Sequence, residues 1–282
     1  MEISQPVASP VLKFTHGGMP KFIRREVAKL HHARCRPGIT VADVAVEGIR
    51  FPMTVDTSSN VGFQLYYYGY IEIREVRYVS SALRAGDVFI DIGANFGFYS
   101  LFAARRVGET GAVHAFEPVP RMADLFVRSM EQNRLTNIVV NRIALADVPG
   151  EHLMHIPARN LGESSFVEVR GTTERITVPV TTLDAYVRER SLSRIDFIKM
   201  DIEGAEGLAL KGMRQTITQF RPKVLMEINP ERLRTLGSSV EEVIRPFQEL
   251  GYQITLIGRR KSRSWRGEAL HGVRNIFAEP RI

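Results

Sequence analysis

Short apolar runs alternate with longer amphipathic stretches through most of the chain. Val88–Ile92 and Ala112–Phe116 are almost wholly apolar, which is typical of strands buried on both faces of a parallel sheet. Between them, Phe98–Arg105 follows a glycine turn and predicts a helix. Because a helix joins two buried strands, the pattern predicts an α/β fold with a mostly parallel sheet.

The same alternation continues toward the C-terminus. Pro120 marks the start of one helix, and Ser239 with Glu242 forms a capping box at the start of another. Between these two helices, Ala205–Phe220 predicts a single continuous helix. We expect the remaining strands to be Ile138–Ile143, Ile195–Met200, Lys223–Ile228, Tyr252–Ile257 and Val273–Ala278.

The first part of the chain lacks this alternation. We expect residues 1–80 to form an N-terminal arm and extension, and residues 81–282 to form the main domain. The extension contains a basic helix at Phe22–Leu30, a β-hairpin over Val41–Thr54 and a tyrosine-rich segment at Leu65–Glu72. Dense aromatic residues are typical of a hydrophobic core or of a dimer interface, so the pattern is also compatible with a homodimer.

The composition is that of an ordinary globular protein. Of 282 residues, 44% are hydrophobic and 24% are charged. No apolar run approaches the roughly 18 residues of a membrane span, and Met1–Pro6 lacks the layout of a secretory signal, so we expect a cytoplasmic protein. The single cysteine, Cys35, excludes an intrachain disulfide and a cysteine-rich metal site.

A formal net charge of +7 favours anionic partners, such as nucleic acid, acidic substrates or a membrane surface. The positive charge is concentrated in two clusters, Lys21–Arg36 and Arg259–Arg266. A solvated basic face is the commoner explanation of such clusters. Charge alone therefore does not choose the partner.

The strand at Val88–Ile92 ends in a turn that contains Asp91, Gly93, Asn95 and Gly97 at every second position. Glycines let a ligand approach the backbone closely, and the following helix offers unpaired N–H groups. A pyrophosphate-binding turn requires Gly-x-Gly-x-x-Gly, and a carboxylate at the strand end repels pyrophosphate. Asp91 instead suits a ligand with a sulfonium or ammonium group, such as S-adenosylmethionine. We expect Ala94 to complete this turn.

The next strands supply the rest of this candidate cofactor site. Glu117 ends the second strand about 20 residues after Gly97, where an acid is placed to bind both ribose hydroxyls. Ala144 follows the third strand, where we expect the adenine ring. Asp147 either accepts a hydrogen bond from the adenine amino group or caps the turn at Pro149-Gly150.

Several segments resemble the FkbM family of S-adenosylmethionine-dependent methyltransferases. The family-specific segment is Lys199-Met200-Asp201-Ile202-Glu203-Gly204-Ala205-Glu206. Segments shared with Rossmann-like methyltransferases in general are Phe89–Gly97, Ala115–Pro118, Ile143–Asp147 and Thr182–Asp184. The resemblance extends from about Tyr66 to Ala278. It implies a Rossmann-like class I methyltransferase fold, with a mostly parallel seven-stranded sheet whose last strand is antiparallel.

The resemblance further implies an O-methyltransferase that uses S-adenosylmethionine and acts on a hydroxyl of a sugar, glycoconjugate or secondary metabolite. Transfer to a hydroxyl requires alignment and a base that removes its proton. Asp201 is the first candidate for this base, because it ends a predicted strand at the ligand-binding edge. Glu203 raises the pKa of a neighbouring carboxylate, and Glu203 and Glu206 are candidates to position the acceptor.

Other candidate acceptor contacts come from loops and strand ends. The resemblance places the polar loop Arg159–Ser165 near the mouth of the active site and the tyrosine-rich segment at its lip. If the loop between the last two strands overhangs the site, its arginines predict an anionic acceptor. The candidate residues are Asn160, Ser164, Ser165, Tyr70, Glu72, Glu227, Arg260 and Arg263.

Asp201, Glu203 and Glu227 also raise a metal alternative. Carboxylate oxygens suit Mg²⁺ or Ca²⁺, and some O-methyltransferases use a divalent ion to bind a diol. The spacing of these acids does not distinguish a metal site from acids that stabilise the N-terminus of the following helix.

Two other functions are compatible with the sequence. A nucleic-acid methyltransferase would explain the basic excess, but clustered carboxylates at Asp201 and Glu203 repel phosphates. Base N-methylation commonly uses an Asn/Asp-Pro-Pro-aromatic turn, which this chain lacks at Asp201-Ile202-Glu203-Gly204. A non-catalytic S-adenosylmethionine-binding protein is the other alternative, and the presence of Asp91, Glu117 and Asp201 argues against it.

Overall fold

The computed structural model describes residues 37–157, 163–168, 172–258 and 261–281. The basic helix predicted at 22–30, the basic cluster at 21–36, Cys35, Asn160 and Arg260 lie outside the described residues.

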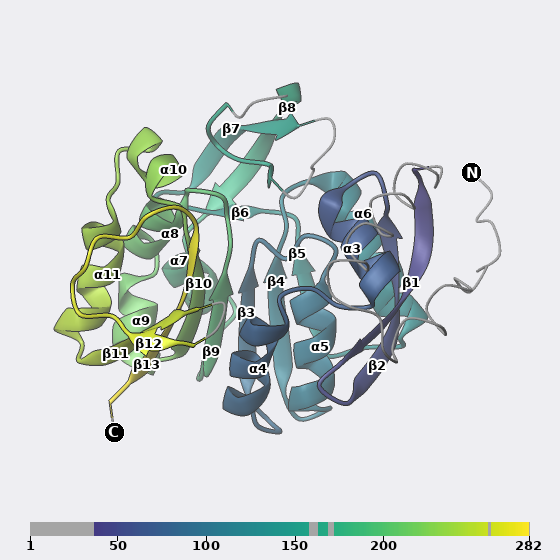
Figure 1. Ribbon diagram of the computed structural model, residues 1–282, viewed down its shortest axis with the longest axis horizontal. Helices are drawn as coiled ribbons and strands as arrows, with labels where there is room; N and C mark the ends of the chain where they lie inside the picture. Colours follow the sequence, from purple (N-terminus) through teal and green to yellow (C-terminus); the bar gives the residue numbers. More distant parts are fainter. Residues whose placement is uncertain (1–36, 158–162, 169–171, 259–260, 282) are drawn as a thin grey trace.

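A central sheet organises the chain (Figure 1). Its strands, in spatial order, are β12 (Arg263–Ser264), β11 (Tyr252–Ile257), β13 (Arg274–Pro280), β10 (Lys223–Ile228), β9 (Phe197–Met200), β3 (Val88–Ile92), β4 (Ala112–Phe116) and β5 (Ile138–Asn141). Strands from β10 to β5 pair in parallel, whereas β13 is antiparallel to both β10 and β11. The predicted Rossmann-like sheet is therefore confirmed. The two-residue strand β12, in the basic loop, is an addition to the seven expected strands.

Helices cover both faces of this sheet, because successive side chains of a buried strand point to opposite faces. Phe89 and Phe197 pack on the face covered by α4 (Ile73–Ala82), α5 (Phe98–Val107) and α6 (Pro120–Gln132). Ile90 and Ile198 pack on the other face. The helices of that face are α7 (Leu183–Glu189), α8 (Glu206–Lys211), α9 (Arg214–Phe220), α10 (Pro230–Thr235) and α11 (Val240–Glu249), which begins with the predicted capping box.

The single helix predicted over residues 205–220 is wrong. The chain forms α8 and α9, which are separated at Gly212 and Met213. A Cβ on Gly212 would lie 2.0 Å from the carbonyl oxygen of Ala146, so the break lets this segment approach the chain beyond β5. The apolar spacing continues across the break, and it therefore did not reveal it.

The third predicted strand also ends early, at Asn141. The chain leaves the central sheet and enters a smaller one with the spatial order β6-β8-β7, which lies beyond one end of the central strands, at the top of Figure 1. Its strands are β6 (Ala144–Leu145), β7 (Gly150–Pro157) and β8 (Thr172–Thr181).

The predicted N-terminal hairpin is present as β1 (Ile39–Val46) and β2 (Ile49–Asp56), which pair antiparallel and pack against α3 (Asn60–Tyr68) and α6. The first four residues of the tyrosine-rich segment, 65–68, form the end of α3, and residues 69–72 connect it to α4. Within it, the Tyr67 ring lies 5.7 Å from Phe63 and 5.0 Å from Tyr68, so packing within the chain accounts for this aromatic density.

Within the described ranges, none of the helices combines the length and the apolar character that crossing a bilayer requires.

We predict that Gly212→Ala destabilises the protein by about 1–3 kcal/mol, because the new methyl group collides with the Ala146 carbonyl. Urea unfolding measures this loss. Gly38→Ala is the control, since a Cβ at Gly38 meets nothing within 4 Å. Equal stability of the two variants would contradict the close approach.

Candidate functional site

A cavity of about 950 Å³, open to solvent, lies at the carboxyl edge of the central sheet. Its wall is formed by the turns after β3, β4 and β9, by β6, and by the residues just before α4. Ligands bind outside the carboxyl ends of the strands in sheets of this kind, so we take this edge cavity as the candidate site. Five residues predicted to hold the cofactor line it: Gly93, Ala94, Asn95, Glu117 and Ala144.

Asp91, Gly97 and Asp147 were predicted with these five but do not line the edge cavity. Asp91 is fully buried at the end of β3, where its Oδ2 accepts a hydrogen bond from Ser100 Oγ at 2.6 Å. Within the described part of the chain, Oδ1 has no hydrogen-bond partner. Burial raises the pKa of Asp91, and the Lys199 ammonium and the Ser100 hydroxyl oppose this rise. Asp147 lies half-buried beyond β6.

The glycines of the turn after β3 serve chain packing. Gly93 and Gly97 both have positive φ angles, of 80° and 81°. A Cβ on Gly93 would lie 2.0 Å from the carbonyl oxygen of Asp201, and a Cβ on Gly97 would lie 2.1 Å from the Phe126 ring. The expectation that their missing side chains leave room for a ligand is therefore not supported. Because these two residues have no side chains, the turn packs closely against the end of β9 and against α6.

Glu117 is buried in the wall of the edge cavity at the end of β4. Its carboxylate accepts backbone N–H bonds from Asn95 at 2.7 Å and from Val119 at 2.9 Å. Burial raises the pKa of Glu117 to about 7, although both N–H groups favour the charged form. Glu117 therefore fixes the glycine turn and presents a proton-sensitive acceptor to the edge cavity.

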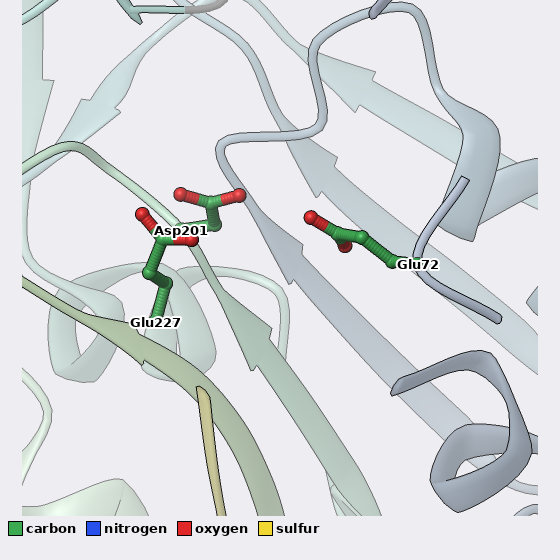
Figure 2. A group of neighbouring side chains, drawn as sticks. All are labelled: Glu72, Asp201 and Glu227. Carbon is green, nitrogen blue, oxygen red and sulfur yellow. The ribbon is translucent and has the colours of Figure 1, made fainter. Parts of the chain in front are cut away.

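Three carboxylates converge at one side of this site (Figure 2). Glu72 precedes α4, Asp201 follows β9, and Glu227 lies in β10; one oxygen of each lies within 4.8 Å of those of the other two. We call them the acidic trio. The Glu72 carboxylate points inward, toward Asp201, and accepts a hydrogen bond from the buried Tyr99 hydroxyl at 2.7 Å. Burial and the charge of Asp201 raise the pKa of Glu72 to about 7 and that of Glu227 to about 9.

Glu203, predicted as a third member of this group, does not join it. Its carboxylate forms an ion pair with Arg232 of α10, whose Nη2 also lies 3.5 Å from Glu163. Glu203 lines the edge cavity and has a positive φ of 56°, but its carboxylate is not one of the three that converge. Among the described residues, the group of acids that could hold a metal ion therefore contains Glu72 in place of Glu203.

Lys199 is a site residue for which we predicted no role. Its ammonium is 3.5 Å from Asp201 Oδ2 and 5.1 Å from the centre of the Tyr99 ring. Burial lowers the pKa of Lys199, but Asp201, Asp91 and other carboxylates outweigh this effect, and the net shift is upward. A signal for this role exists in the sequence, because a lysine in a buried strand, two positions before an acid, lies on the same face as that acid.

Two predicted acceptor contacts hold the backbone instead. Glu206 is 1% exposed, and its Oε1 accepts N–H bonds from Ile202 and Gly204, so it stabilises the turn after β9. Ser165 is buried and donates a hydrogen bond to the carbonyl oxygen of Glu203 at 2.8 Å. These predictions failed because polar residues of a functional turn also satisfy its backbone.

The remaining acceptor candidates lie in different places. Ser164 lines the edge cavity with Glu72 and Asp201. Tyr70 is exposed and lies off the cavity. Arg263, in β12, forms an ion pair with Glu268 and lines a separate pocket.

A known family matches the part of the chain that forms most of the edge cavity. Residues 91–254 match the family described as Methyltransferase FkbM domain, and this match covers more than half of the chain. The chain belongs to the FkbM methyltransferase family. The matched range starts at Asp91 and includes both Glu117 and Asp201.

Curated relatives of this FkbM domain are distant. The chain is 29% identical over 180 residues to the 31-O-demethyl-FK506 methyltransferase FkbM of Streptomyces tacrolimicus, covering 52% of this chain and 67% of that protein. It is 28% identical over 165 residues to the 2-O-methyltransferase NoeI of Sinorhizobium fredii, covering 51% and 65%. For Methyltransferase 1 of Beauveria bassiana the identity is 24%, covering 50% and 65%. The chain thus spans about two thirds of the length of these relatives.

Solved structures that resemble this chain include methyltransferases. Methyltransferase FkbM from Methylobacillus flagellatus has a TM-score of 0.42 and 18% identity, covering 91% of this chain and 59% of that one. Precorrin-6y C5,15-methyltransferase from Geobacter metallireducens has a TM-score of 0.42 and 14% identity, covering 74% and 87%.

We predict that Lys199→Met destabilises the protein by about 3 kcal/mol or more at neutral pH, because the fully buried carboxylate of Asp91 and the half-buried carboxylates of Asp201 and Glu227 lose their cation. Removing the ammonium raises the pKa values of Glu72 and Glu227 further above their unfolded values. Stability is then lost as pH rises, so the difference from the wild type is larger near about pH 8 than near about pH 5.

Urea unfolding at the two pH values measures this difference. Lys211→Met is the control, since Lys211 is exposed in the last turn of α8. An equal loss at both pH values would show that the ammonium does not balance these acids.

Proposed function

We propose that this protein transfers a methyl group from S-adenosylmethionine to a hydroxyl oxygen of a sugar, glycoconjugate or secondary metabolite. The observation that carries the proposal is that one cavity joins the glycine turn and Glu117 to Glu72 and Asp201 of the acidic trio. The names of two relatives support the choice of oxygen, since both specify an O-linked methyl position.

The donor side of the edge cavity is built by the turn after β3 and by Glu117. When bound, S-adenosylmethionine supplies a methyl group that its sulfonium has already activated for displacement. Glu117 keeps lone pairs for ribose hydroxyls beside its two backbone bonds. Asp91, whose Oδ1 is a buried acceptor without a partner in the described chain, adds negative charge behind the turn. This set of acceptors fits a cationic nucleoside.

Asp201 is the proposed general base for the acceptor hydroxyl. It lines the edge cavity, its side chain is 28% exposed, and Lys199 holds its Oδ2. Glu227 belongs to the acidic trio but not to the cavity lining, and with a pKa of about 9 it keeps its proton near neutral pH, so it does not compete with Asp201 for the acceptor proton. Alignment by these groups supplies most of the rate gain, because the donor is already activated.

Positive charge at the acidic trio comes from Lys199 in this proposal. Three carboxylates with oxygens within 4.8 Å of one another also form a donor set that Mg²⁺ accepts. The Lys199 ammonium, at 3.5 Å from Asp201, repels a second cation at the same place. We therefore propose a metal-independent transfer.

The nucleic-acid alternative is less well supported by this site. Glu72 and Asp201 line the edge cavity, and the negative charge of their carboxylates repels a phosphate backbone there. A non-catalytic binding protein would have no use for a paired carboxylate exposed to the edge cavity.

We predict that S-adenosylhomocysteine binds the purified protein and that NAD⁺ does not. Because the pKa of free Glu117 is about 7 and hydroxyl donors favour its charged form, we expect the affinity to rise as pH rises through 7. Glu117→Gln loses about tenfold or more in affinity and the pH dependence above about pH 6. Calorimetric titration measures both.

Glu131→Gln is the matched control, because Glu131 is exposed on α6 away from the edge cavity. Thermal unfolding of each variant checks that it is folded. If the folded wild type does not bind S-adenosylhomocysteine, the proposed function is wrong.

We predict that Asp201→Asn lowers kcat by about 10²- to 10⁴-fold, because it removes the base but keeps the shape of the side chain. Its affinity for S-adenosylhomocysteine changes little. Release of S-adenosylhomocysteine with a panel of hydroxylated sugars and glycosides measures turnover, again with Glu131→Gln as control. A chelator leaves the rate unchanged; a loss that Mg²⁺ restores would instead make the acidic trio a metal site.

A further inference from the structure

A second pocket lies beside the edge cavity and belongs to no part of the donor site. Two of its residues come from the first turn of α4, two follow β11, and two begin β13. We call this the basic pocket, and the residues that matter for its charge are Arg74, Glu75, Lys261, Arg263, Arg274 and Asn275.

Positive charge dominates the basic pocket. Of its four cationic side chains, Arg263 forms an ion pair with Glu268. Among the residues that the structure describes, no carboxylate lies within ion-pair distance of Arg74, Lys261 or Arg274. The one acid of the lining, Glu75, accepts a hydrogen bond from Asn275 at 3.0 Å. A concave surface with such an excess of cations concentrates anions.

The backbone that carries these cations is fixed by hydrogen bonds. β12 pairs with β11, and the Trp265 N–H donates to the carbonyl oxygen of Ile254. The Trp265 indole donates to the Glu268 carbonyl at 2.9 Å, which closes the loop on itself. β13, which carries Arg274, is paired on both sides. Binding an anion therefore requires little ordering of the main chain.

The basic pocket and the acidic trio share a wall. Arg74 lies two residues after Glu72 in the chain, and Asn275 is the direct partner of Glu227 across β10 and β13. Directly paired residues of antiparallel strands point to the same face of a sheet, and the Asn275 amide donates to Glu75, so the negative site and the positive site are neighbours. A ligand that reaches both sites carries a hydroxyl at one end and an anionic group at the other.

We propose that the basic pocket binds a phosphate, sulfate or carboxylate group of the acceptor whose hydroxyl is methylated at Asp201. This inference rests on the proposed function and adds the substrate class, an anionic hydroxyl compound. Guanidinium groups bind such groups through paired, charge-assisted hydrogen bonds, which fixes orientation as well as affinity. Arg74 comes from α4 and Arg274 from β13, and we take these two arginines as the main ligands.

Pyrophosphate is the probe for the first test. Calorimetric titration at low ionic strength, with the protein saturated with S-adenosylhomocysteine, compares the wild type with Arg74→Gln/Arg274→Gln. We expect saturable binding by the wild type and a loss of about tenfold or more in the double variant. Arg188→Gln/Arg214→Gln removes the same charge from the exposed surfaces of α7 and α9 and is the control.

The two outcomes that overturn the proposal are clear. Either the wild type shows no saturable binding, or both double variants bind alike, which is what a solvated basic surface predicts. Thermal unfolding confirms that the variants are folded. The affinity for S-adenosylhomocysteine is measured on the same samples, so failure of the donor site and failure of the basic pocket give different results.

A second test links the basic pocket to the acceptor. Turnover is measured with matched neutral and phosphorylated sugars. We expect the phosphorylated form to have the lower KM, and Arg74→Gln/Arg274→Gln to raise that KM by about tenfold without changing kcat. An unchanged KM in the variant contradicts the link between the basic pocket and the acceptor.

Discussion

The close approach of Gly93 to the end of β9 is the constraint on which the site depends. β3 and β9 are neighbours in the sheet although they are far apart in the chain, and Asp201 donates its N–H to the Ile92 carbonyl. Any side chain at position 93 would collide with the Asp201 carbonyl. Because this contact is tight, the donor turn and the proposed base belong to one rigid edge of the sheet. Catalysis by alignment requires such rigidity.

Charge balance is the second property that shapes this edge. Folding removes several carboxylates at this edge from water at least in part, and this desolvation costs free energy unless a cation lies beside them. Lys199 supplies the positive charge from within β9. Its aliphatic stem packs in the buried strand, while its ammonium group reaches the carboxylates. Glu203 is neutralised separately by Arg232 of α10. Two different cations therefore balance the acids of this edge: Lys199 pairs with Asp201, and Arg232 pairs with Glu203.

The acceptor side combines two polarities in adjacent places. Glu72 and Asp201 of the acidic trio line the edge cavity, and the basic pocket is lined by residues of the first turn of α4 and of the start of β13. An acceptor with a charged group would be oriented by its anion before its hydroxyl meets Asp201. In the proposed arrangement, the positive charge of the basic pocket binds the acceptor, and the negative charge at the edge cavity serves the transfer.

Local patterns in the sequence determined the seven main strands of the central sheet, helices α5, α6 and α11, the hairpin and the glycine turn after β3, because burial and backbone conformation depend on neighbouring residues. They also identified Asp91, Glu117 and Asp201 as acids at strand ends. Only the tertiary structure decided which acids converge: Glu72 joins Asp201 through packing of a distant turn, whereas Glu203 turns toward Arg232. Partners separated by long stretches of chain leave no local periodicity, so three-dimensional packing alone selects them.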